Sequence, residues 1–148
     1  MSNSYSQLYV MLVFSPNNHR PLIRTEFEKP LYKYIESICS NKGQRVLAVN
    51  GTADHIHVLI NLQRDYRVSD IARDIKANSS RFINERDWIN GRFRWQRGYA
   101  AFTYSHSQIP AVVRYILRQK QHHAKKSFQS EYQTLLESFG IKYDEKYL

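Results

Sequence analysis

The sequence predicts an α+β protein built on an antiparallel sheet, and two observations lead to this. Four segments rich in β-forming residues alternate with two segments whose apolar residues repeat at helical spacing, in the order β-α-β-β-α-β. Two further helical segments follow the last strand. The first six elements form the split βαβ pattern of ferredoxin-like folds, with helices mainly on one face of the sheet. We therefore expect the other face to be free to bind a ligand.

Local signals in the first half of the chain predict the first four elements. Residues 8–14 are a run of β-forming residues that stops at the turn 15–18, which contains Pro16. The first helix is expected from Thr25 to about Asn41, with Thr25 and Glu28 forming a capping box at its start and Lys42-Gly43 closing it. Two strands follow, at 45–49 and 55–62, on either side of the polar turn 50–54.

The second half supplies one strand and three helices. Ser69 is expected to cap a second helix that runs to about Glu85 and carries an apolar stripe. Residues 93–104 alternate enough to be a strand, with Gly98 as a bulge. Pro110 suits the first turn of a third helix, expected at 110–126. A last helix is expected at 129–139, ended by Gly140.

Length and composition exclude several classes of protein. The 148 residues suit one domain, 1–148, with a core and third helix at about 8–126 and a C-terminal helix and tail at 127–148. Hydrophobic residues at 42% and aromatic residues at 14% exclude a disordered chain. The single Cys39 excludes an internal disulfide. No apolar run approaches a membrane span and no signal peptide is evident, so we expect a cytoplasmic protein that is associated with the nucleoid when bound to DNA.

The net charge of +9 predicts a polyanionic partner, and its distribution is uneven. Residues 88–130 hold eight Lys and Arg and no Asp or Glu, interleaved with aromatic residues. Such a pattern suits single-stranded nucleic acid, because phosphates need charge and bases need stacking surfaces. The alternative is a solvated face over an ordinary aromatic core. The candidate DNA contacts are Arg94, Arg97, Arg118 and Lys120 in this block, with Arg73, Lys76 and Ser80 on one face of the second helix.

A His-Ile-His sequence opens the third strand. Because side chains alternate across a strand, His55 and His57 point to one face, while Ile56 and its apolar neighbours point to the core. Two imidazoles on one face form a natural pair of metal ligands, and Asp54 could orient one of them. The alternative is a pair of surface histidines.

Tyr115 and Gln119 lie four residues apart in the third helix and so share one face, which His122 continues. A tyrosine on the polar face of a basic helix is a candidate nucleophile, since a phenolate can attack phosphorus. The alternative is a tyrosine that packs through its ring, which is what most of the eleven tyrosines are expected to do.

Together these features resemble the small single-tyrosine transposases of the HUH nuclease superfamily, which move insertion sequences as single-stranded DNA. The resemblance covers about residues 8–139. It rests on Asp54-His55-Ile56-His57-Val58-Leu59, on residues 68–81 of the second helix, on Trp95-Gln96-Arg97-Gly98-Tyr99 and on Tyr115-Ile116-Leu117-Arg118-Gln119.

The resemblance implies a role for each matching residue. Tyr115 would be the nucleophile that forms a 5′-phosphotyrosine link, and His55, His57 and Gln119 would hold a divalent metal ion, Mg²⁺ or Mn²⁺. The third helix would be the nucleophile helix. The implied partners are single-stranded DNA with hairpin ends and a second copy of the chain, whose tyrosine helix would act in trans.

Three alternatives remain open at this point. A non-catalytic module that binds single-stranded nucleic acid would need neither the histidines nor Tyr115. A domesticated HUH endonuclease would cut DNA but no longer transpose. A metal-dependent hydrolase of a small phosphorylated molecule would need a closed pocket, which the basic surface disfavours.

Overall fold

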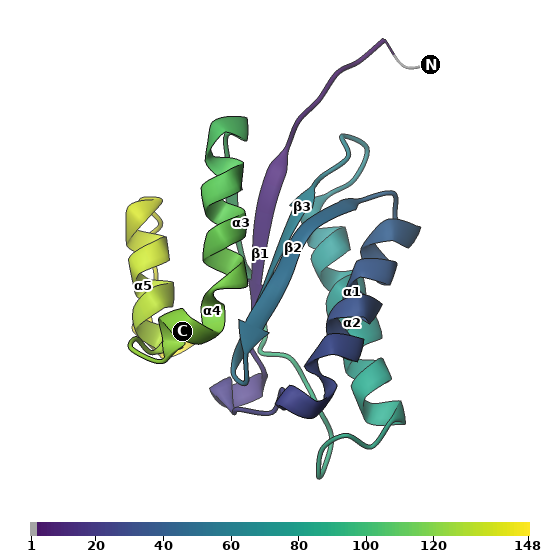
Figure 1. Ribbon diagram of the computed structural model, residues 1–148, viewed down its shortest axis with the longest axis vertical. Coiled ribbons are helices and arrows are strands. Elements are labelled where there is room, and N and C mark those ends of the chain that lie inside the picture. Colours follow the sequence, from purple (N-terminus) through teal and green to yellow (C-terminus); the bar gives the residue numbers. More distant parts are fainter. Residues whose placement is uncertain (1–2) are drawn as a thin grey trace.

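Four strands form one antiparallel sheet between two layers of helices in the computed structural model, which describes residues 3–148 (Figure 1). The strands are β1 (Tyr9–Phe14), β2 (Arg45–Thr52), β3 (His55–Asn61) and β4 (Ala100–Tyr104). The helices are α1 (Thr25–Asn41), α2 (Val68–Glu85), α3 (Ile109–Leu117), α4 (Gln119–His123) and α5 (Phe128–Ser138), with short 3-10 turns η1 (Asn17–His19), η2 (His106–Gln108) and η3 (Glu145–Tyr147). Within residues 3–148, no helix is both long and apolar enough to cross a bilayer.

The strand order is β2-β3-β1-β4, and each neighbouring pair is antiparallel. The α+β, ferredoxin-like fold class is therefore confirmed. β1 lies at the centre, and all six of its residues are buried. Val13 of β1 pairs with His57 of β3, and Asn50 of β2 pairs with His57 from the other side. The histidine strand is thus held between two partners, which fixes which way its side chains point.

α1 and α2 cover one face of the sheet (Figure 1). Val10, Leu12 and Phe14 of β1 point to this face, as do Ile56 and Val58 of β3. The apolar stripes of the two helices pack against them. This main core confirms that Ile56 and its alternate neighbours on β3 point inward.

α3, α4 and α5 lie against the opposite face (Figure 1). Met11 and Leu59 of the sheet pack there with Ile116 of α3 and with Phe128 and Leu136 of α5. The expectation of a free second face is therefore wrong at β1 and β3, because the C-terminal helices are themselves amphipathic and need an apolar surface to cover. His55 and His57 lie beneath this layer and are fully buried.

The last strand is shorter than the expected 93–104. Gly98, at φ 80°, turns the chain out of the ladder, and β4 begins at Ala100. Upstream of it, Trp95 makes only an isolated bridge with Pro16, and Gln96 N–H donates to the Ser15 carbonyl at 2.7 Å. This segment anchors the chain in the main core rather than extending the sheet.

The expected helix at 110–126 is two helices, because the backbone of Arg118 leaves helical geometry at φ −100° and ψ 17°. The amide of Asn50 on β2 donates to the carbonyls of Ile116 and Leu117, at 3.0 and 3.2 Å. These carbonyls would otherwise accept hydrogen bonds from the next turn, so the side chain of Asn50 explains the break. The break lies between Tyr115 and Gln119.

The expected N-caps of the first two helices are also wrong. Arg24 caps α1 and Arg67 caps α2, both in extended conformation and without a side-chain hydrogen bond. Glu28 instead pairs with Lys120 at 3.1 Å, so it is drawn away from the helix end. α5 begins at Phe128, one residue earlier than expected, because Ser127 Oγ accepts from the Ser130 N–H at 3.2 Å.

Candidate metal and nucleophile site

The site is built on the first three residues of β3. His55 and His57 project from one face of the strand, and their ring centroids lie 5.1 Å apart. Both side chains are fully buried beneath α4 and α5. Ile56, between them, is held in the core. A slip of one residue in strand register would move the apolar residues of β3 out of the core, so the register keeps His55 and His57 on this face.

His55 is held from two sides. Its Nδ1 lies 2.8 Å from Oδ1 of Asp54 and 3.0 Å from Oγ1 of Thr52. The ring of Phe128 stacks on it, with centroids 4.2 Å apart. When Asp54 accepts the Nδ1 proton, the lone pair on Nε2 points into the site, so Asp54 orients His55 as expected.

Gln119 and Tyr115 bring the second set of functional groups. Oε1 of Gln119 lies 2.6 Å from Nε2 of His55, and its side chain is fully buried. Tyr115 is half-buried, with its ring edge-on to His57 and to His122, each at a centroid distance of 5.7 Å. The break at Arg118 therefore does not separate Tyr115 from Gln119. All four residues named as nucleophile and ligands converge within one chain.

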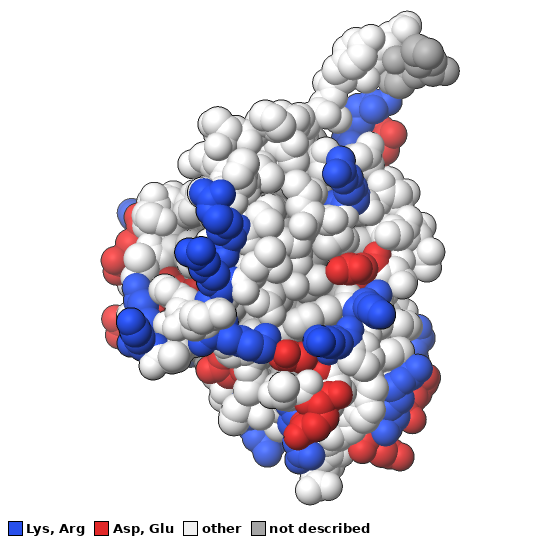
Figure 2. Space-filling model, viewed as in Figure 1, with Lys and Arg blue, Asp and Glu red and all other residues white. Residues whose placement is uncertain are grey.

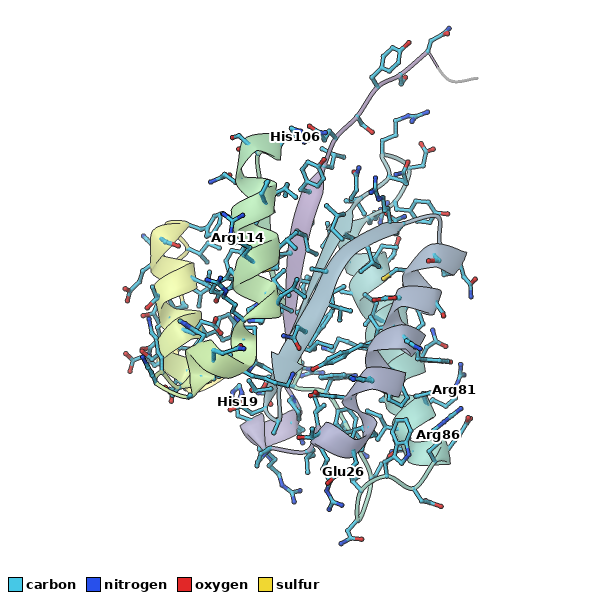
Figure 3. All side chains as sticks on the ribbon, viewed as in Figure 1. His19, Glu26, Arg81, Arg86, His106 and Arg114 are labelled. Carbon is cyan, nitrogen blue, oxygen red and sulfur yellow. The ribbon has the colours of Figure 1, made fainter. Side chains whose placement is uncertain are left out.

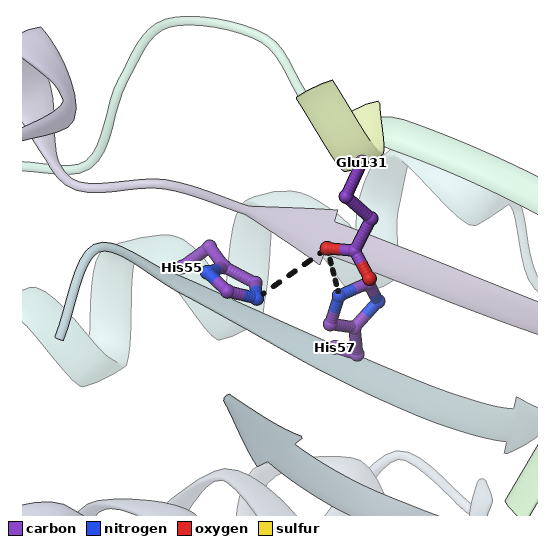
Figure 4. A group of neighbouring side chains, drawn as sticks. All are labelled: His55, His57 and Glu131. Atoms are coloured by element: carbon purple, nitrogen blue, oxygen red, sulfur yellow. Dashed lines mark hydrogen bonds and ion pairs between the residues drawn. The ribbon is translucent and has the colours of Figure 1, made fainter. Parts of the chain in front are cut away.

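Glu131, in the first turn of α5, contacts all four of these residues, and Figure 4 shows its carboxylate against His55 and His57. Its Oε2 accepts hydrogen bonds from the Tyr115 hydroxyl and, at 3.0 Å, from Nε2 of Gln119. Its Oε1 lies 3.4 Å from Nε2 of His57 and 2.9 Å from Nε2 of His123. The ligand atoms of His55, His57 and Glu131 all lie within 4.8 Å of one another, which is a spacing that one metal ion can bridge.

Burial sets the protonation of the site. It lowers the pKa of His57 well below the ordinary value, helped by the charge of His55, and it lowers the pKa of His123 to about 4. Burial also raises the pKa of Glu131 to about 7. The imidazoles of His57 and His123 are thus neutral at neutral pH, and neutral imidazole is the form that binds metal ions.

A basic groove of about 720 Å³ opens beside Tyr115. Its cationic walls are Arg114, Arg118, Lys125 and Lys126. Figure 2 shows Lys and Arg side chains gathered over α3 and α4, and Figure 3 shows Arg114 on α3. Tyr115 itself lines this groove, so a polyanion bound there would lie against its side chain.

Three other predicted DNA contacts share a second hollow. Lys76 and Ser80 of α2 line it together with Arg94, and its volume is about 290 Å³. Lys76 Nζ also donates to the carbonyls of Gln96 and Gly98, both at 2.8 Å. This hollow belongs to the α2 side of the sheet, away from the basic groove.

The remaining predicted contacts are scattered. Arg97 lines a small recess beside Tyr99. Arg73 is exposed and pairs with Asp70 and Asp74 of its own helix. Lys120 pairs with Glu28 and donates to Asn50 at 3.0 Å, so it joins α4 to α1 and β2. Of the seven predicted contacts, Arg118 alone lines the groove that contains Tyr115.

Sequence reasoning missed Glu131 and His123. Glu131 follows the segment without carboxylates and lies in the expected last helix, 129–139, where no motif marks it. One signal could have identified it: Glu131 lies at helical spacing from apolar residues of its helix, three residues after the buried Phe128 and four before Leu135, which packs against the same cluster. A carboxylate at a core position needs a partner, and an unpaired one marks a candidate site.

The sequence matches the profile of one protein family. That family is described as IS200-like transposases, and the match covers residues 4–119. The chain is also 29% identical over 94 residues to the transposases for insertion sequence element IS200 of Salmonella typhimurium (strain LT2) and Salmonella typhi. These matches cover 60% of this chain and 61% of each relative, so less than two thirds of the relatives' length is matched.

Two solved structures share the fold. One is a crystal structure assigned as a transposase from Deinococcus radiodurans R1, with a TM-score of 0.65 and 18% identity, covering 80% of this chain and 95% of that one. The other is a REP-associated tyrosine transposase bound to a REP hairpin, with a TM-score of 0.63 and 17% identity, covering 83% of this chain and 73% of that one. At these identities the likeness establishes the arrangement of elements.

Proposed function

The chain belongs to the IS200-like transposase family, and from that premise we propose that it cleaves and rejoins single-stranded DNA at insertion-sequence ends through a covalent link to Tyr115. One observation carries the proposal. The Tyr115 hydroxyl, the His55–His57 pair and Gln119 converge on one point within a single chain, at the edge of a basic groove.

We propose that His55, His57 and Gln119 hold a divalent cation, Mg²⁺ or Mn²⁺. The residues fit such an ion. With Asp54 holding the Nδ1 proton of His55, Nε2 of His55 and Oε1 of Gln119 are both acceptors, yet they face each other at 2.6 Å. Two acceptors this close need a cation or a proton between them. Mixed nitrogen and oxygen ligands suit Mn²⁺ well and Mg²⁺ acceptably. When bound, such an ion supplies Lewis-acid stabilisation of the charge on the scissile phosphate.

Tyr115 supplies the nucleophile in this proposal. Its hydroxyl attacks phosphorus in line with the bond to the 3′ oxygen, which gives a 5′-phosphotyrosine link and a free 3′-hydroxyl. Because the link conserves the energy of the original phosphodiester, a second 3′-hydroxyl can reverse the step and join new ends without ATP. Arg114 and Arg118, beside Tyr115, are placed to bind the phosphates on either side.

The second hollow offers a place for folded DNA. The REP-associated relative was solved with a DNA hairpin. We propose that a hairpin end of the substrate contacts Lys76, Ser80 and Arg94, which line one concave surface outside the groove. Because these residues lie away from Tyr115, their removal should weaken binding of hairpin DNA more than binding of a plain single strand. A protein acting in this way on chromosomal DNA would work at the nucleoid.

The role of a second copy is a separate question. The family resemblance implies a homodimer in which the tyrosine acts in trans. Here Glu131 joins the Tyr115 hydroxyl to the histidines of the same chain, which favours a tyrosine that acts in cis. Mixing the inactive variants Tyr115→Phe and His57→Ala tests this, because activity returns only if tyrosine and histidines come from different chains.

A nicking assay tests the proposed function. The substrate is a library of single-stranded oligonucleotides with random sequence beside a hairpin, incubated with Mg²⁺ or Mn²⁺. We expect a denaturation-resistant protein–DNA adduct from the wild type and from Tyr66→Phe, a control at an exposed tyrosine. Tyr115→Phe should form none, and His57→Ala should lose metal-dependent cleavage.

Three outcomes would contradict the proposal. An adduct with Tyr115→Phe would exclude Tyr115 as the nucleophile. Binding without cleavage by the wild type would indicate a non-catalytic binding module. Cleavage without rejoining would indicate an endonuclease that no longer transposes.

A further inference from the structure

Glu131 is the most buried carboxylate of the site, with 2% of its surface exposed. It lies beyond the stretch that matches the family profile, which ends at residue 119. α5 brings it back over β3, so that its two oxygens face different partners. Oε1 faces the imidazoles of His55, His57 and His123, at 3.6, 3.4 and 2.9 Å from their Nε2 atoms. Oε2 accepts from Tyr115 and Gln119.

The charge of this carboxylate has no fixed counterpart. A buried carboxylate is stable only when a cation or several hydrogen-bond donors compensate it. Within residues 3–148, every ion pair of Glu131 is with a histidine, and none is with Lys or Arg. An imidazole can donate a hydrogen bond to the carboxylate, but it is not a permanent positive charge as a Lys or Arg side chain is. A divalent cation between Oε1 and the two histidines of β3 would supply the missing charge.

We propose that Glu131 is shared between the cation and the nucleophile. Oε1 ligates the divalent ion together with His55 and His57, and Oε2 holds the Tyr115 hydroxyl and accepts its proton during cleavage. This inference rests on the proposed function, because it assumes that Tyr115 attacks DNA at this site. It assigns a fourth ligand for the cation, beside His55, His57 and Gln119, and a proton acceptor for Tyr115.

The proton transfer balances in both directions. In cleavage, the bond from Tyr115 Oη to phosphorus forms and the bond from phosphorus to the 3′ oxygen breaks. The Oη proton passes to Oε2 of Glu131, and the departing 3′ oxygen takes a proton from water, which leaves hydroxide. In rejoining, the incoming 3′-hydroxyl gives its proton to hydroxide, its oxygen bonds to phosphorus, and Glu131 returns its proton to Oη as the phosphotyrosine bond breaks.

Sharing one carboxylate makes the nucleophile depend on the cation. When Oε1 is fixed as a ligand, Oε2 is fixed too, and with it the direction of the Tyr115 hydroxyl. Loss of Glu131 should therefore weaken cation binding and also slow attack after the cation is restored to saturation. If Glu131 were purely structural, replacing it in a variant that still folds would change neither the cation affinity nor the rate of attack.

The test compares Glu131→Gln with Glu137→Gln, an exposed position on the same helix. Mn²⁺ affinity is measured by calorimetry without DNA, and adduct formation is measured separately at saturating Mn²⁺. We expect Glu131→Gln to bind Mn²⁺ at least about tenfold more weakly, and to form adduct at least about 100-fold more slowly, since proton transfer contributes about 10²–10⁴ in rate. Glu137→Gln should match the wild type in both.

Unchanged Mn²⁺ affinity in a folded Glu131→Gln variant would overturn the proposal, as would unchanged adduct formation at saturation. Glu131→Asp serves if the first variant does not fold. Aspartate retains the charge but is shorter by one methylene group, so the variant should largely keep its Mn²⁺ affinity while it forms adduct slowly. If Glu131→Asp kept both the Mn²⁺ affinity and the rate of adduct formation of the wild type, the proposal would again be overturned. If the wild type binds Mn²⁺ but forms no adduct, the proposed function fails, while the calorimetry still tests Glu131 as a ligand.

Discussion

Replacing Glu131 by glutamine should stabilise the metal-free protein above pH 7, although it damages the site. Burial raises the pKa of Glu131 from its ordinary 4.5 to about 7. The folded state therefore holds a proton on this carboxyl over a pH range in which the unfolded chain has lost it. Ionising the buried carboxyl destabilises the fold, so this contribution is absent below pH 4.5 and grows until pH exceeds 7.

The size of the effect follows from the shift. One pKa unit corresponds to about 1.4 kcal/mol, so a rise from 4.5 to about 7 costs the wild type about 3 kcal/mol of unfolding free energy above pH 7. Glutamine has nearly the same shape and no charge. In EDTA, Glu131→Gln should thus be more stable than the wild type by up to about 3 kcal/mol at pH 8, and equal to it near pH 4.5.

The assay is urea unfolding of both proteins in EDTA from pH 4.5 to 8. The buried imidazoles are common to both proteins, so the difference in unfolding free energy reports on Glu131. Adding Mn²⁺ at about 100 times its Kd should then stabilise the wild type by about 2.7 kcal/mol and Glu131→Gln by much less. A difference that stays flat with pH, or a variant that is less stable at pH 8, would refute the reasoning.

Three further changes probe the parts around this centre. Gly51→Ala places a methyl group against the carbonyl oxygen of His55, so β2 and β3 must part, and thermal unfolding should show a loss of about 1–3 kcal/mol. Asp54→Ala removes the acceptor that orients His55, and calorimetry should show Mn²⁺ binding weakened about tenfold with the fold intact. Arg118→Ala should weaken the binding of single-stranded DNA and make the slope of log K against log salt concentration shallower by about 0.7. The control is Arg81→Ala, on the α2 side (Figure 3), and equal effects of the two substitutions would contradict the assigned groove.

Much of the fold could be predicted because local signals and burial agree. The alternation around Ile56 indicated which face of β3 is core, and the structure has His55 and His57 on the other. The element order indicated the antiparallel sheet. These inferences depend only on side-chain alternation along a strand and on helical spacing, which act within a few residues.

The errors come from contacts between distant segments. The break between α3 and α4 depends on Asn50 of β2, which is 66 residues from Ile116 in the chain. The short β4 depends on Gly98 and on pairing of the preceding segment with residues beside Pro16. Neither partner can be recognised from its own neighbourhood in the sequence.

In the candidate site too, some residues could be identified from local sequence motifs and others only from contacts between distant segments. Resemblance to the family named Tyr115, His55, His57 and Gln119, and the structure brings them together. Glu131 carried no such motif, and its role follows only when α5 is placed over β3 (Figure 4). A carboxylate on an apolar helical stripe is the local mark of such a residue, and it gains meaning from the partners that the fold supplies.

The most direct test of the central claim is to locate the covalent link on the protein. Trypsin cleaves after Arg114 and after Arg118, which isolates a four-residue peptide with Tyr115 as its one tyrosine. After reaction with single-stranded DNA, nuclease trimming and mass spectrometry, this peptide should carry a 5′-linked nucleotide phosphate. A nucleotide on any other peptide, or none in a preparation that cleaves DNA, would contradict the account.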